Sequence, residues 1–548
     1  MTSLLLPPAA FAELTTHRLA RPELVLQGSG AQAAGFDAGQ VFCCPKPEEP
    51  QSLYTTQSRT ELADRYGGIG AGMAGGSGRC SSYGSLQTKG VGVTPLVAPN
   101  ADAHHSSGTM TLTGALEEAL FGEVFQLALP FGALPVHAVL TTERLSATGR
   151  PPAEARALAV RPLVARPAHF LRNLLNPDGR AASGAQAPGL TCDADRVRLA
   201  MAFLATNLQL ALRLDMPGAD EAEILDAGLK ELVRRLAWQF AAGFAKRLPH
   251  GSMSCSNLAL SGAYLDFGLS SFVPAYRRIC WANGQDSWTE SLSPVRTLVS
   301  LRRQLDCYRP SLRTASVISA DDMAIQFGQH LQQRLAVEMA KMAGLTEDMA
   351  QACPADLLAA WLTAMRDIFQ RGADERFVVN PGAMADGAPA PAPRRSGRYD
   401  LNAVLSVAAP CVDGQDMDRA LAPLLDDPAL RLRFVRAAVD VRHSLLASAG
   451  DAGANLAAYL GAQAERKNTV LDGLQRDTWF RTVAIRRIED SADADRIHAV
   501  MDETLAWSRH VLSDLHPWLP GANGLEQLQA WPASGLPAAE LQAQVPRR

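Results

Sequence analysis

A single short stretch, His250–Ser270, limits the fold and chemistry of this chain more than any other. Its sequence, HGSMSCSNLALSGAYLDFGLS, contains a His-Gly pair, then Asn257, then the Asp-Phe-Gly triplet that begins at Asp266. Residues 258–265 read as a short hairpin, with apolar strands on either side of a Ser-Gly turn. Such a hairpin returns Asp266 toward Asn257, and an amide oxygen beside a carboxylate suits Mg²⁺. We therefore predict a metal site at these two residues; the alternative is an ordinary buried hairpin with a chance triplet.

Far upstream, a glycine-rich segment indicates a loop that can bind an anion. Residues 66–78 read YGGIGAGMAGGSG and are followed by Arg79. Glycine at this density forms neither a stable helix nor a packed strand, and it lets backbone N–H groups approach phosphate closely. The segment lacks the G-K-[ST] ending of a P-loop and the strand–GxGxxG–helix context of a Rossmann fold. We predict that this loop, in which Gly76 and Gly78 precede Arg79, can bind an anion; the alternative is a flexible surface loop.

The residues after this loop supply the charges that a nucleotide site needs. Lys89 closes a predicted strand, and the helical pattern that follows carries Glu118. A further predicted strand, residues 158–164, carries Arg161, and Arg172 comes shortly after it. A strand lysine held by a helix glutamate can bind phosphate, and the arginines can reach phosphate from the sheet. The alternative for each residue is an ordinary surface charge or surface ion pair.

The composition describes a globular chain and argues against some functions. The chain has 548 residues, of which 47% are apolar and 20% charged, and its net charge is -4. This composition is typical of a folded protein and does not indicate a nucleic-acid surface. No run of about 18 apolar residues predicts a membrane span, and the opening MTSLLLPPAAFAEL lacks the basic region of a secretory signal. The nine cysteines are scattered without a C-x-x-C pair, so we expect a reducing, cytoplasmic location.

The order of the predicted elements indicates an α+β chain in three parts. Strand signals dominate residues 1–150, and residues 151–330 place the His250–Ser270 stretch among long helices. Residues 331–548 are mainly helical, with a Pro-, Ala- and Gly-rich linker at 381–398. We expect a two-lobed core that ends near residue 330, followed by an additional helical region.

The ordered set of motifs resembles the selenoprotein O family over roughly residues 14–272. The segment G-S-G-R at 76–79 is similar to the family's G-D-G-R, and LQTKGVGVTP at 86–95 is similar to its L-x-x-K-G-x-G-x-T-P. The segment ALEEALFGEVF at 115–125 is similar to its S-I-R-E-[FY]-L-x-S-E-A-[ML]. Finally, HGSMSCSN at 250–257 is similar to its H-G-V-[ML]-N-T-D-N.

The resemblance implies a protein-kinase-like, two-lobed fold that binds ATP in a flipped orientation and transfers AMP to protein hydroxyls. It implies that Lys89 holds phosphates and pairs with Glu118, and that Asn257 and Asp266 hold Mg²⁺. The remaining implied phosphate contacts are Arg79 and either Arg161 or Arg172.

The chain also departs from the family's pattern. Ser256 stands where the family has the Asp that is its proposed general base, and a hydroxyl cannot accept a proton at neutral pH without a base beside it. Ser77 replaces the Asp of G-D-G-R, and the run at 106–113 replaces the family's arginines before the helix. The last cysteine is Cys411, so the family's C-terminal redox residue is absent. These departures favour nucleotide binding over AMP transfer to protein hydroxyls.

Three classes of function follow from the sequence. The first is a nucleotidyl or phosphoryl transferase that uses ATP and Mg²⁺ on a protein, peptide or small-molecule substrate; a carboxylate acceptor would need no base, because it is already ionised. The second is a pseudoenzyme that binds a nucleotide or a partner protein as an accessory subunit, a role that divergent relatives have in siderophore-microcin maturation. The third is a purely structural helical protein, against which the retained lysine, glutamate and metal-ligand residues argue.

Overall fold

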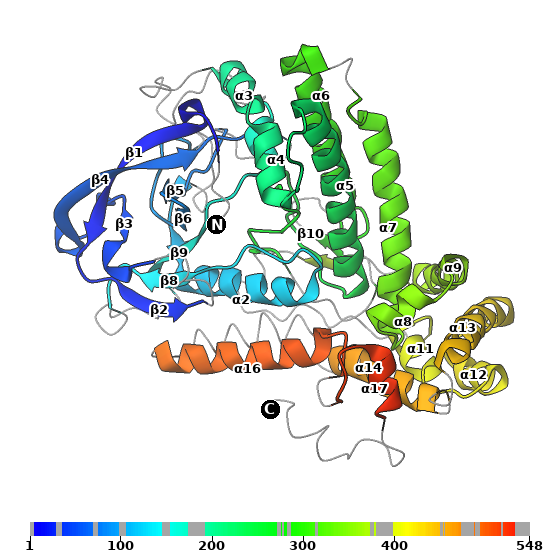
Figure 1. The fold of residues 1–548 in the computed structure, drawn as a ribbon. Coiled ribbons are helices and arrows are strands. Elements are labelled where there is room, and N and C mark those ends of the chain that lie inside the picture. Colours follow the sequence, from blue (N-terminus) through cyan, green and yellow to red (C-terminus); the bar gives the residue numbers. More distant parts are fainter. Residues whose placement is uncertain are drawn as a thin grey trace.

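The computed structural model is an α+β structure, with one antiparallel sheet at the start of the chain and helices through most of the rest (Figure 1). The structure describes residues 5–28, 36–68, 75–97, 106–144, 154–173, 192–270, 276, 279–281, 286–312, 316–372, 377–379, 398–449, 453, 455–472, 487, 491, 494–516 and 519–531. Most of the linker expected at 381–398 lies outside these residues.

The sheet has nine strands in the described part of the chain, and every pairing in it is antiparallel. Their spatial order is β2-β8-β9-β6-β5-β4-β1-β3, and β7 pairs with β9. The bounds are β1 (Phe11–Leu19), β2 (Glu23–Gln27), β3 (Phe42–Cys43), β4 (Tyr54–Asp64), β5 (Cys80–Tyr83), β6 (Leu86–Lys89), β7 (Met110–Thr111), β8 (Ala138–Thr141) and β9 (Arg156–Pro162). Because β9 belongs to this sheet, the sheet extends past residue 150.

Strand β6 lies inside the sheet, between β5 and β9, and ends at Lys89 as the sequence predicts. Gln87 is paired with Arg161 of β9, and Lys89 is paired with Ala159. Since side chains alternate along a strand, those of Gln87 and Lys89 point to the same face of the sheet. That face is the one from which the candidate site is built.

Helix α2 (Leu112–Ala128) packs on this sheet through β8 and β9. It begins where the sequence predicts a helix, and the Thr111 side chain caps it by accepting a hydrogen bond from the backbone N–H of Gly114. Its apolar residues are spread around the helix instead of forming one stripe, and most of them are buried. A helix that is apolar on all sides is covered on more than one side.

The remaining helices form the larger part of the chain. Two of them, α5 and α7, lie side by side, with α4 and α6 against them (Figure 1). The bounds are α3 (Asp193–Met201), α4 (Leu204–Leu212), α5 (Glu221–Ala245), α6 (Leu292–Tyr308), α7 (Ala320–Met342), α8 (Glu347–Ala352), α9 (Ala355–Arg371), α11 (Leu401–Ala408), α12 (Gly414–Leu421), α13 (Pro428–Ala449), α14 (Leu456–Asp472), α16 (Ala494–Leu512) and α17 (Gly524–Gln529). A short parallel pair joins β10 (Ile279–Trp281) to β11 (Phe377–Val379).

Two helical segments are more divided than their periodicity predicts. The periodicity of residues 195–215 predicts a helix there, and the structure has two, α3 and α4. The helical pattern over 401–463 is split into four helices, because Asp413 caps α12 and Pro428 begins α13. The Pro-rich sequence after residue 517 predicts an irregular tail, but the structure has the short helix α17 there. No helix in the described ranges is long and apolar enough to cross a membrane.

Candidate nucleotide and metal site

Lys89 joins the sheet, helix α2 and the Asp266 segment in one buried cluster. Its ammonium donates to a carboxylate oxygen of Glu118 and, at 2.6 Å, to Oδ1 of Asp266. Lys89 and Glu118 are each only 2% exposed. The predicted pairing of Lys89 with Glu118 is therefore confirmed, and Asp266 is a third member of the cluster that the sequence did not place there.

Arg161 completes the charge balance around Glu118. Its Nη1 donates to the second carboxylate oxygen of Glu118, and its Nε donates to Oε1 of Gln87 at 3.0 Å. Arg161 is buried, and both hydrogen bonds are to protein acceptors. In this arrangement Arg161 neutralises and orients Glu118, and two of its guanidinium nitrogens are already occupied.

Arg166, which the site prediction did not include, connects the sheet to the loop before Asn257. Its Nη2 donates to Oε1 of Gln87 at 2.8 Å, and its Nη1 donates to the backbone carbonyl of Ser256 at 3.2 Å. Gln87 in turn donates to Oδ2 of Asp64 at 2.7 Å. Nothing in the sequence separates Arg166 from the other arginines near it, because its role depends on Gln87 and on a carbonyl far along the chain.

The hairpin predicted between Asn257 and Asp266 is present. Leu258 and Tyr264 form an antiparallel bridge, and the backbone N–H of Leu265 donates to the carbonyl of Asn257 at 3.1 Å. The backbone of Asn257 thus lies against the residue that precedes Asp266. Asp266 has a φ of 68°, a left-handed conformation that non-glycine residues adopt at a cost and that recurs at functional sites.

The electrostatics keep Asp266 ionised. Burial opposes ionisation of this carboxyl, but Lys89, Arg79 and Arg161 outweigh burial and hold its pKa well below the usual range. The side chain remains 33% exposed. An ionised carboxylate that is partly open to solvent can still take a further positive partner.

Asn257 and Asp266 are residue types that could hold a magnesium ion together with phosphate. Asn257 donates its amide Nδ2 to the carbonyl of Ser252 at 2.8 Å, and its amide oxygen, the atom that could bind a metal, lies 3.5 Å from the Ser256 hydroxyl. One carboxylate and one amide oxygen are the number of protein ligands that Mg²⁺ commonly uses beside substrate phosphates. Among the described residues no cluster of three or more His, Cys, Asp or Glu could hold a metal by itself.

His250 fixes the backbone just before Asp266. Its Nε2 lies 3.0 Å from the carbonyl of Leu265, and because a carbonyl only accepts, Nε2 carries the proton. Its ring packs against Phe125, Tyr264 and Phe267. Burial lowers the pKa of His250 to about 4, so the ring is neutral at physiological pH.

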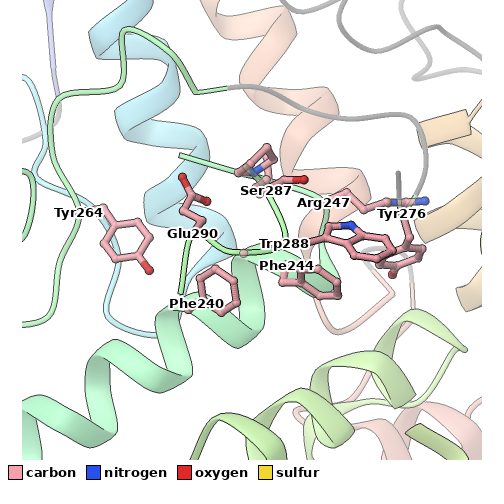
Figure 2. A pocket seen from close by; sticks show the side chains of 11 residues that line it. Phe240, Phe244, Arg247, Tyr264, Tyr276, Ser287, Trp288 and Glu290 are labelled. Carbon is pink, nitrogen blue, oxygen red and sulfur yellow. The ribbon is translucent and has the colours of Figure 1, made fainter. Parts of the chain in front are cut away.

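Glu290 holds the His-Gly pair from the other side. Its two carboxylate oxygens accept from the backbone N–H groups of His250 at 3.1 Å and Gly251 at 2.7 Å. Burial raises the pKa of Glu290 to about 7, against the effect of these two hydrogen bonds. Figure 2 shows Glu290 at the edge of a pocket with aromatic walls from α5 and from Trp288. Lys89, Asn257 and Asp266 do not line this pocket, so it is separate from the charged cluster.

Ser256 has no basic partner in the described part of the chain. Its hydroxyl lies 2.9 Å from the hydroxyl of Ser254 and makes a long contact of 3.5 Å with Oδ1 of Asn257. Neither partner can accept and hold a proton at neutral pH. At Ser256, where the resemblance implies that the family has a general base, the structure has a pair of hydroxyls.

The other two arginines predicted to contact phosphate, Arg172 and Arg79, lie in different surroundings. Arg172 donates to the hydroxyl of Tyr308 at 2.9 Å and to Asp193 at 3.3 Å, so its guanidinium is part of a separate network. Arg79 immediately precedes β5, is half-buried, and acts on Asp266 through its charge. Of the two arginines offered as alternatives, Arg161 is thus the one that the structure brings to the cluster.

The end of the glycine-rich segment is packed tightly against the sheet. Gly76 forms a bridge with Arg65, and a Cβ on Gly76 would lie 2.4 Å from the carbonyl of Asp64. The carbonyl of Gly78 accepts from the backbone N–H of Thr94 at 3.2 Å. Residues 69–74, the middle of the segment, lie outside the described ranges.

No protein-family model matches this chain, and no curated protein matches it either. The resemblance to the selenoprotein O family therefore stays a hypothesis that rests on the motifs.

The buried cluster predicts a large cost for removing the charge of Glu118. Glu118→Gln leaves Lys89 and Arg161 facing a neutral amide, and breaking a buried ion pair in this way costs about 3–5 kcal/mol. Urea denaturation should show this loss in the free energy of unfolding. The matched control is Glu123→Gln on the same helix, where the carboxyl is half-buried and lies outside the Lys89 cluster. Equal losses of unfolding free energy in the two variants would contradict the role of Glu118 as the buried partner of Lys89 and Arg161.

The raised pKa of Glu290 predicts a specific pH dependence. Between pH 4.5 and about 7 the folded protein keeps the Glu290 proton that the unfolded chain has lost, so the stabilisation present below pH 4.5 is lost as the pH rises through 7. The free energy of unfolding should fall by roughly 3 kcal/mol over this range, because a pKa difference of one corresponds to about 1.4 kcal/mol. Glu290→Gln should remove this pH-dependent part of the stability, which is measured by comparing the free energy of unfolding at pH 4.5 and at pH 8. An unchanged pH dependence would show that Glu290 ionises normally.

Proposed function

We propose that this protein binds ATP with Mg²⁺ and transfers a nucleotidyl group (AMP) or a phosphoryl group to a substrate, on a kinase-like two-lobed core that resembles the selenoprotein O family. The observation that carries the proposal is the buried pair of Lys89 and Glu118 joined to Asp266. A strand lysine, a helix glutamate and a carboxylate beside an amide are the parts that position nucleotide phosphates and their metal.

Each residue has a definite role in this proposal. Lys89 and Arg79 supply positive charge for the phosphates, and Arg161 orients Glu118. Asp266 and Asn257 hold Mg²⁺, which would neutralise the charge on the phosphates when bound. Because Lys89 already contacts both carboxylates, its position is fixed before any ligand arrives.

The Ser254–Ser256 hydroxyl pair supports a change in the acceptor. A hydroxyl substrate needs a base, and general-base assistance is worth about 10²–10⁴-fold in rate. A carboxylate is already ionised and needs none. The same observation supports the second candidate, an accessory protein that binds a nucleotide and a partner without transferring a group.

Asp266→Ala should weaken the binding of magnesium–ATP by at least about tenfold, because it removes the anionic metal ligand proposed here. Isothermal calorimetry with and without Mg²⁺ checks this. The matched control is Asp195→Ala, which removes an exposed carboxylate on α3 and should leave affinity unchanged. Unchanged affinity in Asp266→Ala would refute the metal role.

Ser256→Asp should increase AMP transfer to hydroxyl acceptors, because it supplies a carboxylate where the chain has only a hydroxyl. The measurement is label transfer from ATP radioactive at the α-phosphate onto generic protein substrates. Ser252→Asp places the same side chain nearby, outside the hydroxyl pair, and should have no such effect. If wild-type protein labels hydroxyls as fast as Ser256→Asp does, the base lies elsewhere.

A further inference from the structure

Helix α16, from the C-terminal region, lies along α2 and also contacts β2 (Figure 1). Its buried side chains recur at helical spacing and form one stripe: Ile497, Val500, Met501, Thr504, Trp507, Ser508, Val511 and Leu512. The apolar members of this stripe belong to the same hydrophobic core as the buried residues of α2. The stripe therefore covers α2 instead of facing solvent.

The Glu123 side of α2, which is turned away from Lys89, is within reach of the charge of α16. Burial raises the pKa of Glu123, and the charge of Arg509 on α16 opposes this rise. At about 100° per residue, Glu123 lies roughly 140° around the helix from Glu118. Helix α16 thus supports α2 from behind the Glu118 side chain.

The other side of α2 faces the candidate site. Glu118 reaches Lys89, and the ring of Phe125 lies 5.0 Å from that of Phe267, which directly follows Asp266. A Cβ on Gly122 would be 3.7 Å from the Phe267 ring. Helix α2 is consequently held between the Asp266 segment and α16.

The C-terminal end of α16 is tied to the helical region. Arg466 of α14 donates to the carbonyls of His510 and Ser513, the latter at 2.8 Å. Asp514, two residues after α16, pairs with Lys341 of α7 at 2.8 Å. These bonds make α16 a connection from α7 and α14 to α2.

We propose that α16, through the buried stripe that has Thr504 at its centre, positions α2 so that Glu118 stays on Lys89. A buried ion pair is favourable only when its geometry is held closely, and α16 packs on α2 in addition to the sheet. The catalytic meaning of this support rests on the proposed function, but the placement of Glu118 does not.

The test is the reactivity of Lys89 toward an amine-reactive reagent, followed by mass spectrometry on the full chain without nucleotide. Thr504→Arg places a long cation in the stripe, where Thr504 is 1% exposed, and should lift α16 from α2. Lys89 should then be labelled at least several-fold faster than in the wild type. Ala506→Arg puts the same side chain on the exposed face of α16 and should leave the rate unchanged. Equal labelling of Lys89 in both variants would overturn the proposal.

A control for general destabilisation is Leu445→Ala, which opens a cavity in α13, a helix that packs on α9 and α12. Lys89 labelling should stay at the wild-type rate in this variant; a comparable increase would show a global effect and overturn the proposal. Met501→Ala removes apolar contact from the buried stripe without adding charge. It replaces Thr504→Arg in the labelling test if that variant does not fold. Deuterium uptake of α2 should rise with that of α16, and a rise in α16 alone would also overturn the proposal. Because the assay uses no nucleotide, this proposal and the proposed function fail separately.

Discussion

The structure depends on a cluster of charges that are removed from water. Lys89 pairs with Glu118 and Asp266, Arg161 pairs with Glu118, and three of these four side chains are almost fully buried. Taking such charges out of water costs several kcal/mol per ion, and only close pairing offsets that cost. The sheet, helix α2 and the hairpin before Asp266 must therefore be placed relative to one another for any of these charges to be buried.

The sequence predicts those parts of the cluster that have a local signal. Lys89 ends a strand, Glu118 lies on a helix, and Asn257 and Asp266 are separated by a turn, and each of these features is found. The contact of Lys89 with Asp266 had no such signal, because 177 positions separate the two residues. Periodicity describes which face of an element is buried, but it does not describe which distant element covers that face.

The arginines illustrate the same limit. Arg161, Arg166 and Arg172 follow one another closely, and composition gives each an equal claim to phosphate. Their partners decide between them: Glu118 for Arg161, a backbone carbonyl for Arg166, and Tyr308 for Arg172. Backbone carbonyls carry no sequence signature, so the role of Arg166 could be seen only in three dimensions. Helix α2 is a partial exception, because its apolar residues on all sides indicate a second covering element, although they do not identify α16.

The charge balance of the cluster is consistent with an anionic ligand that brings its own cation. Lys89 and Arg161 neutralise Glu118 and Asp266, and Arg79 adds a further positive charge that acts on Asp266. Phosphates would be attracted by Lys89 and Arg79, while a metal ion would replace part of the positive charge that Asp266 now receives from Lys89. Phosphate and metal together would therefore preserve the balance that either one alone would disturb. This coupling, together with the covered position of α2, makes the Lys89–Glu118 pair the point at which nucleotide, metal and the C-terminal helices would influence one another.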